Sequence, residues 1–510
     1  MSALRLPRPR ALGVDIGGAL NLVGSLLRYL SLAFLFPAAL AIGYSEPVWP
    51  FLAAGALTAG FGLGLGRLTH GKERVGVREG FLVVALTWLL AAAAVSLPYL
   101  FSGEEQLSHP VNAFFEAMSG MTTTGASVLT DVESLDRSLL MWRQFTQWLG
   151  GMGIIVLALA VLPRLRVGGR QLMESELPGP EIEALSTSIR DTARRLWLLY
   201  VALTAVLVLV LSGLGWAGVD ERMGLYEAVA HAFTTMPTGG FGTEPRSIEP
   251  FAPASQWVIA LFMILAGANF ALLYRAFVRR KPRVLVRDQE LRLYAFLLVV
   301  ASALLVAILW DAEIREGEAA FRDGVFQTVS IMTTTGYANT DFNAWLAIAP
   351  AAAMLIVALM FPGGSAGSTA GSIKIVRHLV IGKVLRRELD QTVHPEYVTP
   401  VRVNRVAVDE RTVRGVIAFV LLYVGIFVAG AVLLLLDAHR VELQLSPFAA
   451  LAASATTLGN VGPAFGFAGP MGSFEPFSDV SKGIMIGLMW IGRLEIVPVV
   501  ALLTRAYWRA

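Results

Sequence analysis

A short threonine–glycine motif occurs four times in this chain, each time directly after a short, mainly apolar segment. Aligned on one glycine, the copies are MTTTGAS at Gly125, MPTGGFG at Gly239, MTTTGYA at Gly336 and ATTLGNV at Gly459. Apolar segments of this length are too short to cross a bilayer as helices but suit re-entrant ones. A loop at membrane depth is tolerated only where protein or a water-filled cavity surrounds it. The four copies therefore predict re-entrant loops around one pore with fourfold pseudosymmetry.

The composition is that of an integral membrane protein. Of the 510 residues, 55% are hydrophobic and 15% are charged, and the mean hydropathy is +0.63. These values lie far from those of soluble domains. The absence of cysteine excludes disulfides and thiolate metal sites, and the six histidines form no metal-ligand pattern. Since no Walker motif or phosphorylation signature is present either, we expect no enzyme activity, no organic cofactor and no nucleic-acid partner.

Hydrophobic runs predict ten membrane spans. Residues 22–45 and 47–66 form two N-terminal spans, and the glycines in 60–66 suit close helix contact. A unit of span, half-span, glycine loop and span then occurs four times, as in repeat-built transport proteins. The expected fold is all-α, with four pore repeats around one pore and two extra N-terminal spans. The expected boundaries are 1–76 for the N-terminal part and 77–170, 190–283, 288–390 and 408–510 for the repeats.

Basic residues predict the orientation of these spans. They cluster before the first span, between the second and third spans, and in 164–170, 275–292 and 374–414, and they recur at the C-terminus. Lys and Arg collect on the cytoplasmic side of a membrane. Both termini are therefore expected in the cytoplasm, and all four glycine loops enter the membrane from outside.

The glycine loops suit a dehydrated monovalent cation. Backbone carbonyls from four loops can replace the hydration shell of such an ion, and glycine permits the required dihedrals and a close approach to the axis. The half-helices would direct the negative ends of their dipoles at the pore, which favours a cation. A single such loop would be interpreted as an ordinary turn at the end of a helix. Four copies, each at the same place between two spans, favour a pore for potassium. The candidate filter residues are Thr123, Thr124, Gly125, Thr238, Gly239, Thr334, Thr335, Gly336, Thr457, Leu458, Gly459 and Asn460, with potassium at Thr124, Gly125, Thr238, Gly239, Thr335, Gly336, Leu458 and Gly459.

The second span of the third repeat cannot be a continuous helix. Pro362 and four glycines fall within ten residues, and both residue types oppose a helix. A broken helix that lines a cavity is one interpretation, and small residues for tight helix packing are the other. Arg493, in the last span, is a functional candidate because an intramembrane arginine is costly; the alternative is a buried pair with Glu495. Lys374 either interacts with carbonyls or phosphates or extends to the membrane interface.

The chain resembles the Trk/Ktr/HKT potassium transporter superfamily and, within it, the bacterial TrkH-type membrane subunits. The resemblance covers almost the whole chain, including the two extra N-terminal spans. It is carried by WRQFTQWLGGMGI at 142–154, TGGFGT at 238–243, GGSAGSTAGSIK at 363–374 and ATTLGNVGPAFG at 455–466. One departure is Met236–Pro237, where relatives often carry Ser or Thr.

This resemblance implies a function and a location. It implies potassium uptake across the bacterial cytoplasmic membrane, a homodimer in membrane lipid, and a cytosolic nucleotide-binding regulatory subunit of the TrkA type. Glycine rather than serine at position 125 implies potassium rather than sodium. The residues to which the resemblance assigns a mobile gate beneath the filter are Gly363, Gly364, Ser365, Gly367, Ser368, Gly371, Lys374 and Arg493.

Two other functions stay open on the residues alone. One is transport of sodium by the same fold. For either cation, channel-like flux and transport coupled to protons or sodium are both compatible with the sequence. The other is secondary transport of an organic solute, which would leave the four glycine loops unexplained. A membrane-embedded enzyme would need clustered Asp, Glu or His at a bilayer face, and the sequence shows no such cluster.

Overall fold

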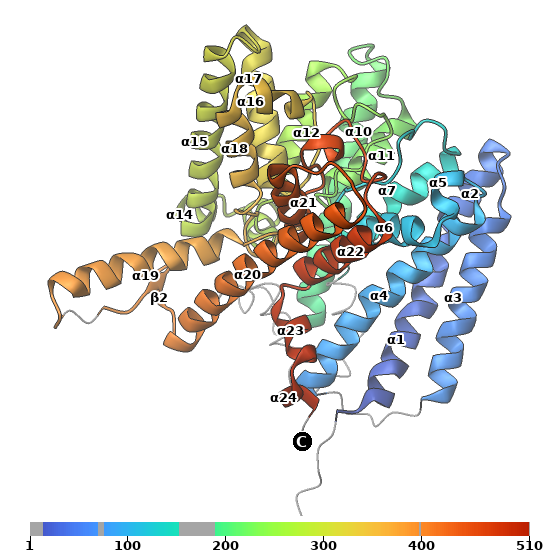
Figure 1. Ribbon diagram of the computed structural model, residues 1–510, viewed down its shortest axis with the longest axis horizontal. Helices are drawn as coiled ribbons and strands as arrows, with labels where there is room; N and C mark the ends of the chain where they lie inside the picture. Colours follow the sequence, from blue (N-terminus) through green and yellow to red (C-terminus); the bar gives the residue numbers. More distant parts are fainter. Residues whose placement is uncertain (1–13, 70–75, 152, 154–188, 397–398, 509–510) are drawn as a thin grey trace, which may run out of the picture.

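The computed structural model describes residues 14–69, 76–151, 153, 189–396 and 399–508, which are mostly helical (Figure 1). Within these residues, six helices are long and apolar enough to cross a membrane, and two bent helix pairs would bring the number to eight. The only strands in this described part are β1 (Arg402–Val403) and β2 (Val406–Ala407), which form an antiparallel hairpin. The expected class, a mostly helical multi-pass membrane protein, is confirmed. The count of ten spans stays a prediction, because the end of the first repeat and its basic loop at 164–170 lie outside the described residues.

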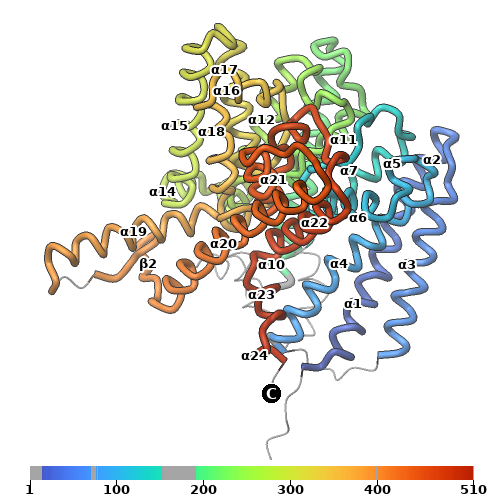
Figure 2. Tube along the Cα trace, viewed as in Figure 1, coloured from blue at the N-terminus to red at the C-terminus, as the bar shows by residue number. Residues whose placement is uncertain are grey.

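The two N-terminal spans pack closely through glycine. Helices α1 (Ile16–Leu30), η1 (Ser31–Phe34) and α2 (Leu35–Tyr44) form one 29-residue span, and α3 (Trp49–Leu68) packs beside α1 (Figure 2). A Cβ added to Gly24 would lie 2.8 Å from the carbonyl oxygen of Gly62. Asn21 donates from its amide nitrogen to the Gly66 oxygen at 3.1 Å and to the Thr69 oxygen at 2.7 Å, near the end of α3. The close contact expected for residues 60–66 is present.

Among the remaining described residues, the order of helix, half-helix, loop and helix occurs four times. The half-helices are the α6, α11, α16 and α21 helices. The first unit has α4 (Val77–Phe101), α5 (Glu105–Ser108), α6 (Pro110–Met121) and α7 (Arg137–Gly151). The second has α10 (Ile189–Trp216), α11 (Leu225–Thr235), α12 (Pro253–Ala266), α13 (Phe270–Leu273) and η3 (Tyr274–Val278). The third has α14 (Arg283–Arg287), α15 (Gln289–Asp311), α16 (Gly317–Met332), η4 (Phe342–Ala344), α17 (Trp345–Ile348), α18 (Pro350–Leu359) and α19 (Ile375–Val393), and the fourth has α20 (Glu410–Arg440), α21 (Pro447–Gly459), η5 (Gly466–Ala468), α22 (Asp479–Arg493), α23 (Val497–Leu503) and α24 (Arg505–Trp508).

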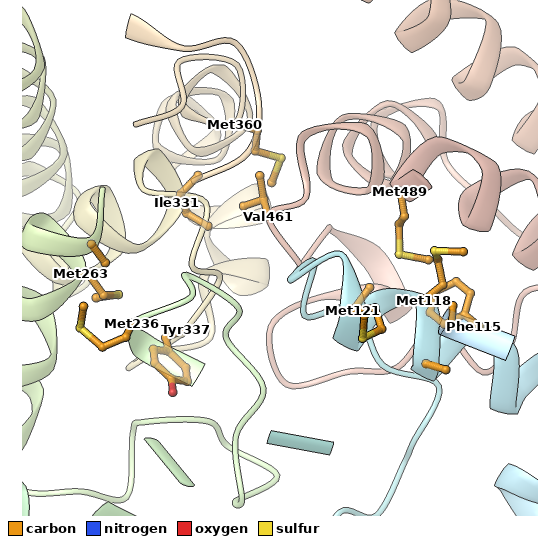
Figure 3. Close-up of a cluster of buried hydrophobic side chains, with 14 of the residues drawn as sticks. Phe115, Met118, Met121, Met236, Met263, Ile331, Tyr337, Met360, Val461 and Met489 are labelled. Carbon is orange, nitrogen blue, oxygen red and sulfur yellow. The ribbon is translucent and has the colours of Figure 1, made fainter. Parts of the chain in front are cut away.

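The four half-helices form the centre of the molecule. Pro110 and Pro447 occupy the first positions of α6 and α21, where a missing backbone N–H costs nothing. Most residues of α6 and α21 are buried, polar ones included, because the spans surround these helices. Apolar side chains gather at their inner ends, among them Met121, Ile331 and Val461 (Figure 3). The half-helices therefore end inside protein, as re-entrant segments must.

Two spans that the sequence analysis treated as continuous are broken. The α12 helix and the α13–η3 segment meet at 100°, and α22 and α23 meet at 118°. At the first break, Asn269 accepts a hydrogen bond from the Leu272 nitrogen at 3.0 Å and so caps a new helix. At the second break, Glu495 and Ile496 have φ angles of 56° and 60°, which a right-handed helix excludes. The second and fourth repeats are therefore interrupted as well as the third, which the sequence did not predict.

An arm made of α19, the β-hairpin and the start of α20 projects from the body (Figure 1). Val380 and Val384 of α19 pack against Val403 of the hairpin and Val413 of α20. This small apolar cluster fixes the hairpin to the two helices, so the arm is one packed unit.

We predict that Gly24→Ala destabilises the protein, because the added methyl group forces α1 and α3 apart. Overpacking of this kind costs about 1–3 kcal/mol. Thermal unfolding of the detergent-solubilised protein measures the effect as a lower midpoint. Gly60→Ala is the matched control, since a Cβ on Gly60 meets nothing within 4 Å. Equal midpoints for the two variants would contradict the proposed contact.

Candidate cation site

The four loops that follow the half-helices share one backbone conformation. In each loop a left-handed residue is followed, two positions later, by a glycine with positive φ. The φ angles are 53° and 82° at Thr123 and Gly125, 56° and 78° at Thr238 and Gly240, 56° and 83° at Thr334 and Gly336, and 54° and 115° at Asn460 and Gly462. We call residues 123–125, 238–240, 334–336 and 460–462 the pore loops. A threonine with positive φ costs about 1–3 kcal/mol and persists only where the surrounding structure holds it.

This geometry corrects the alignment of the second and fourth loops. The nitrogens of Thr124, Gly239, Thr335 and Val461 each donate to the carbonyl five residues earlier, so these four residues are equivalent. The glycines that match Gly125 and Gly336 are therefore Gly240 and Gly462, not Gly239 and Gly459. Gly459 is instead the last residue of α21. The shared sequence is Thr or Asn, then any residue, then Gly. The alignment missed it because the second loop has two adjacent glycines, Gly239 and Gly240, and because Gly459 ends the α21 helix just before the fourth loop.

The pore loops close into a ring through contacts that only glycine permits. A Cβ on Gly462 would lie 2.8 Å from the carbonyl oxygen of Thr124. Each of the other three glycines meets the equivalent oxygen of the next loop in the same way. The overlapping pairs are Gly125 with the Gly239 oxygen, Gly240 with the Thr335 oxygen and Gly336 with the Val461 oxygen. The four loops thus contact one another in a closed cycle, from the first to the second, third and fourth and back to the first.

Threonine and asparagine side chains hold the loops from behind. The hydroxyls of Thr122 and Thr124 lie 2.7 Å apart, and those of Thr333 and Thr335 lie 2.8 Å apart. Asn460 donates to the Thr124 hydroxyl and to the Met489 carbonyl, both at 3.0 Å, and so ties the fourth loop to the first. These bonds hold the first and third loops internally and join the fourth loop to the first.

A buried ion pair braces the first two loops. The Arg143 Nε lies 2.5 Å from Glu116 Oε1, with 3% and 0% of the two side chains exposed. Glu116 also accepts from the Val128 nitrogen at 3.0 Å, just after the first loop, and Arg143 donates to the Gly242 carbonyl at 3.1 Å, just after the second. Through these hydrogen bonds the pair holds both loops in place. Removing one partner would leave the other as an unpaired buried charge, which is strongly destabilising.

The second loop makes two hydrogen bonds with the side chain of Gln147. Gln147 donates to the Gly239 carbonyl at 2.7 Å and accepts from the Phe241 nitrogen at 3.1 Å. Pro237 lies one residue before this loop, where a Cβ on Gly151 would overlap with it. The departure at Met236–Pro237 therefore affects the packing beneath the loop, and Gln147 holds the loop in place.

The residues between α18 and α19 form a closed, non-helical loop. The Gly363 nitrogen donates to the Ile373 carbonyl at 3.0 Å, and the Ile373 nitrogen donates to the Phe361 carbonyl at 3.2 Å. We call residues 363–371 the glycine-rich loop. Its Ser365 nitrogen donates to the Gly267 carbonyl at 2.8 Å, at the break between α12 and α13. The interpretation of this segment as a broken helix is confirmed.

The glycine-rich loop lies directly against the pore loops. The Gly371 nitrogen donates to the Thr334 hydroxyl at 2.7 Å. A Cβ on Gly371 would overlap with the Gly459 carbonyl at the end of α21, and Thr369 donates to the Met236 carbonyl at 3.0 Å. The loop therefore packs beneath the ends of three half-helices.

Arg493 and Lys374 both contact carbonyls around the glycine-rich loop. Arg493 donates to the Thr369 carbonyl at 2.9 Å and to the Gly150 carbonyl at 3.2 Å. Lys374 donates from Nζ to the Ala370 carbonyl. Glu495 pairs with Arg377, so Arg493 binds the loop rather than the neighbouring acid. Through Arg493, the C-terminal end of the loop is thus joined to the last span and to the end of α7.

Acidic side chains lie in the connections at the outer ends of the units. Partial burial and a hydrogen bond with Glu133 raise the pKa of Glu244. Partial burial and the charge of Asp136 raise the pKa of Glu104. Mutual proximity of these acids produces a negative potential that attracts cations.

Comparisons with known proteins agree with this architecture. The family described as TrkH, a cation transport protein, matches residues 50–508. The chain belongs to the TrkH family. It is 36% identical over 444 residues to the Trk system potassium uptake protein TrkH of Escherichia coli strain K12, which covers 86% of this chain and 87% of that protein. It is 34% identical over 499 residues to TrkH of Halomonas elongata, which covers 96% of this chain and 98% of that protein.

A solved structure of the TrkH family has the same fold. The crystal structure of the potassium transporter TrkH from Vibrio parahaemolyticus superposes with a TM-score of 0.84 at 31% sequence identity. The superposition covers 97% of this chain and 99% of that one.

We predict that alanine substitution of Gly462 impairs ion selectivity more than alanine substitution of Gly459. This pair of variants tests which of the two glycines belongs to the pore loop. Gly462→Ala places a methyl group against the Thr124 carbonyl, so it should disrupt the ring and reduce discrimination between potassium and sodium about tenfold or more. Gly459→Ala is the matched control, because a Cβ there meets its nearest atom, the Met360 oxygen, at 3.2 Å. Flux of the two ions into vesicles containing each variant measures the ratio. A larger loss in Gly459→Ala than in Gly462→Ala would restore the alignment on Gly459.

Proposed function

We propose that this chain is a potassium uptake protein of the bacterial cytoplasmic membrane. The observation that carries the proposal is the closed ring of four pore loops, in which four glycines each contact a carbonyl of the next loop. Carbonyls arranged in this way replace the water around a monovalent cation. The names of the TrkH-family relatives, which are potassium uptake proteins, support potassium as that cation.

The selectivity filter of this proposal differs from the sequence-based one in two repeats. Potassium would contact the backbone carbonyls of the second and third residues of each pore loop. These residues are Thr124 and Gly125, Gly239 and Gly240, Thr335 and Gly336, and Val461 and Gly462. The half-helices end at the loops, so their dipoles add negative potential where the ion sits.

The gate of the proposed transporter is the glycine-rich loop together with Arg493. The loop packs beneath the pore loops and is held there by hydrogen bonds to Thr334 and from Arg493. This loop can rearrange without breaking regular secondary structure, because residues 363–371 contain no helix or strand. Conduction would require that the loop leave this position.

The partners and orientation are proposals of the same kind. The basic residues of the arm favour a cytoplasmic position for α19 and the hairpin, and hence cytoplasmic termini. A cytosolic nucleotide-binding subunit of the TrkA type would bind at this face, and the Trk system names of the relatives support such a subunit. A homodimer in membrane lipid is the expected assembly.

We predict that the chain restores growth at limiting potassium to bacterial cells that lack their own potassium uptake systems. The intact chain, expressed with and without a TrkA-type subunit, should rescue potassium uptake. The Gly336→Ser variant should lose most or all of this rescued uptake. The serine side chain would overlap with the Val461 carbonyl and distort the ring.

Rescue is measured as the initial rate of potassium or rubidium uptake. Gly382→Ser is the matched control, because a Cβ on Gly382 in α19 meets nothing within 4 Å. No rescue by intact protein that is present in the membrane would overturn potassium as the substrate, and sodium uptake would be measured next. Equal uptake by the intact chain and Gly336→Ser would overturn the filter.

A further inference from the structure

One buried carboxylate joins the glycine-rich loop to the arm. Glu290 lies in the first turn of α15, and 7% of it is exposed. Its Oε1 accepts a hydrogen bond from the Ala366 nitrogen at 2.6 Å and another from the Val376 nitrogen at 3.1 Å. Ala366 belongs to the glycine-rich loop and Val376 to the first turn of α19. A single oxygen atom therefore connects the start of α15 to the glycine-rich loop and to the first turn of α19, which lie 76 and 86 residues further along the chain.

Glu290 also supplies the cap that α19 lacks. The N-cap residue of α19, Lys374, makes no side-chain capping hydrogen bond. The first backbone N–H groups of a helix need acceptors and carry partial positive charge, so a carboxylate is favoured there. Glu290 occupies this position from another helix. Any displacement of α19 along or away from α15 would therefore break the capping bond.

The residue before Glu290 is held by the arm as well. Asn404 of the hairpin accepts from the Gln289 nitrogen at 2.9 Å and donates to Asp288 at 2.7 Å. Lys383 of α19 donates to the Gln289 side chain at 2.5 Å. Because these bonds fix the start of α15 to the arm, movement of the arm changes the position of the Glu290 carboxylate.

We propose that Glu290 is a positioning residue of the gate, whose carboxylate holds the glycine-rich loop closed against the start of α19. When the arm moves, the start of α15 moves with it, the bond from Ala366 to Glu290 is lost and the loop is released. Glu290 thus transmits a conformational change from the cytoplasmic arm to the pore. This inference rests on the assignment of the glycine-rich loop as the gate.

The first test is potassium efflux from vesicles that contain the full chain. Removing both hydrogen bonds in Glu290→Ala should raise basal efflux about tenfold or more. Glu290→Gln keeps an acceptor oxygen and should restore most of the closure. Glu318→Gln is the matched control, because 59% of the Glu318 side chain is exposed on α16, and its efflux should equal that of the unchanged chain.

The second readout is exposure of the glycine-rich loop itself. The chain has no cysteine, so Ser368→Cys introduces one labelling site. A membrane-impermeant thiol reagent on the cytoplasmic side should label this site at least several times faster with Glu290→Ala than with Glu290→Gln. A purely structural effect of Glu290→Ala would lower the yield and melting temperature without this graded change in labelling.

The outcomes separate this inference from the proposed gate. Unchanged efflux and labelling in Glu290→Ala, while deletion of residues 365–371 raises efflux, would overturn the role of Glu290 alone. Unchanged efflux in a folded deletion variant would overturn the gate and this inference with it. If Glu290→Ala does not fold, Asn404→Ala decides, since release of the hairpin from α15 should raise efflux in the same direction and an unchanged rate would overturn the coupling.

Discussion

The structure depends on a backbone carbonyl of each pore loop lying against the α-carbon of the glycine in a neighbouring loop. Only glycine allows this approach, because a Cβ on any of Gly125, Gly240, Gly336 or Gly462 would overlap with the facing oxygen. The residue two positions before each glycine must adopt a left-handed conformation, which is unfavourable for threonine. The buried Glu116–Arg143 pair and the Asn460 bonds stabilise this arrangement from behind.

The broken spans follow from the need to place irregular backbone beneath that ring. In a continuous helix through α12, the carbonyl of Gly267 would accept a hydrogen bond from within the helix. The break leaves this carbonyl to accept from the Ser365 nitrogen of the glycine-rich loop. Arg493, at the end of α22, likewise donates to the loop carbonyl of Thr369. Each interruption thus supplies a donor or an acceptor to the loop, which satisfies backbone groups that no lipid could satisfy.

Much of this architecture could be predicted from the sequence, and the errors have identifiable causes. Long apolar runs and the repeated threonine–glycine motif predicted the helices, the re-entrant loops and the broken segment at 363–371. The register failed at Gly239 and Gly459, because glycine content alone does not show which residue takes positive φ; Asn460 before Gly462 was the available signal. Contacts between distant segments, such as those of Gln147 and Glu290, leave no local pattern, since they depend on how the units pack together.

The most direct test of the account is to locate the permeant ion. A structure of the chain determined in rubidium or thallium, whose scattering identifies the ion, should show density on the axis of the ring, within contact of the carbonyls of Thr124, Gly239, Thr335 and Val461. The same experiment in sodium should show weaker density or none there. Ion density that is absent from the ring in rubidium, or that lies away from these four loops, would contradict the account.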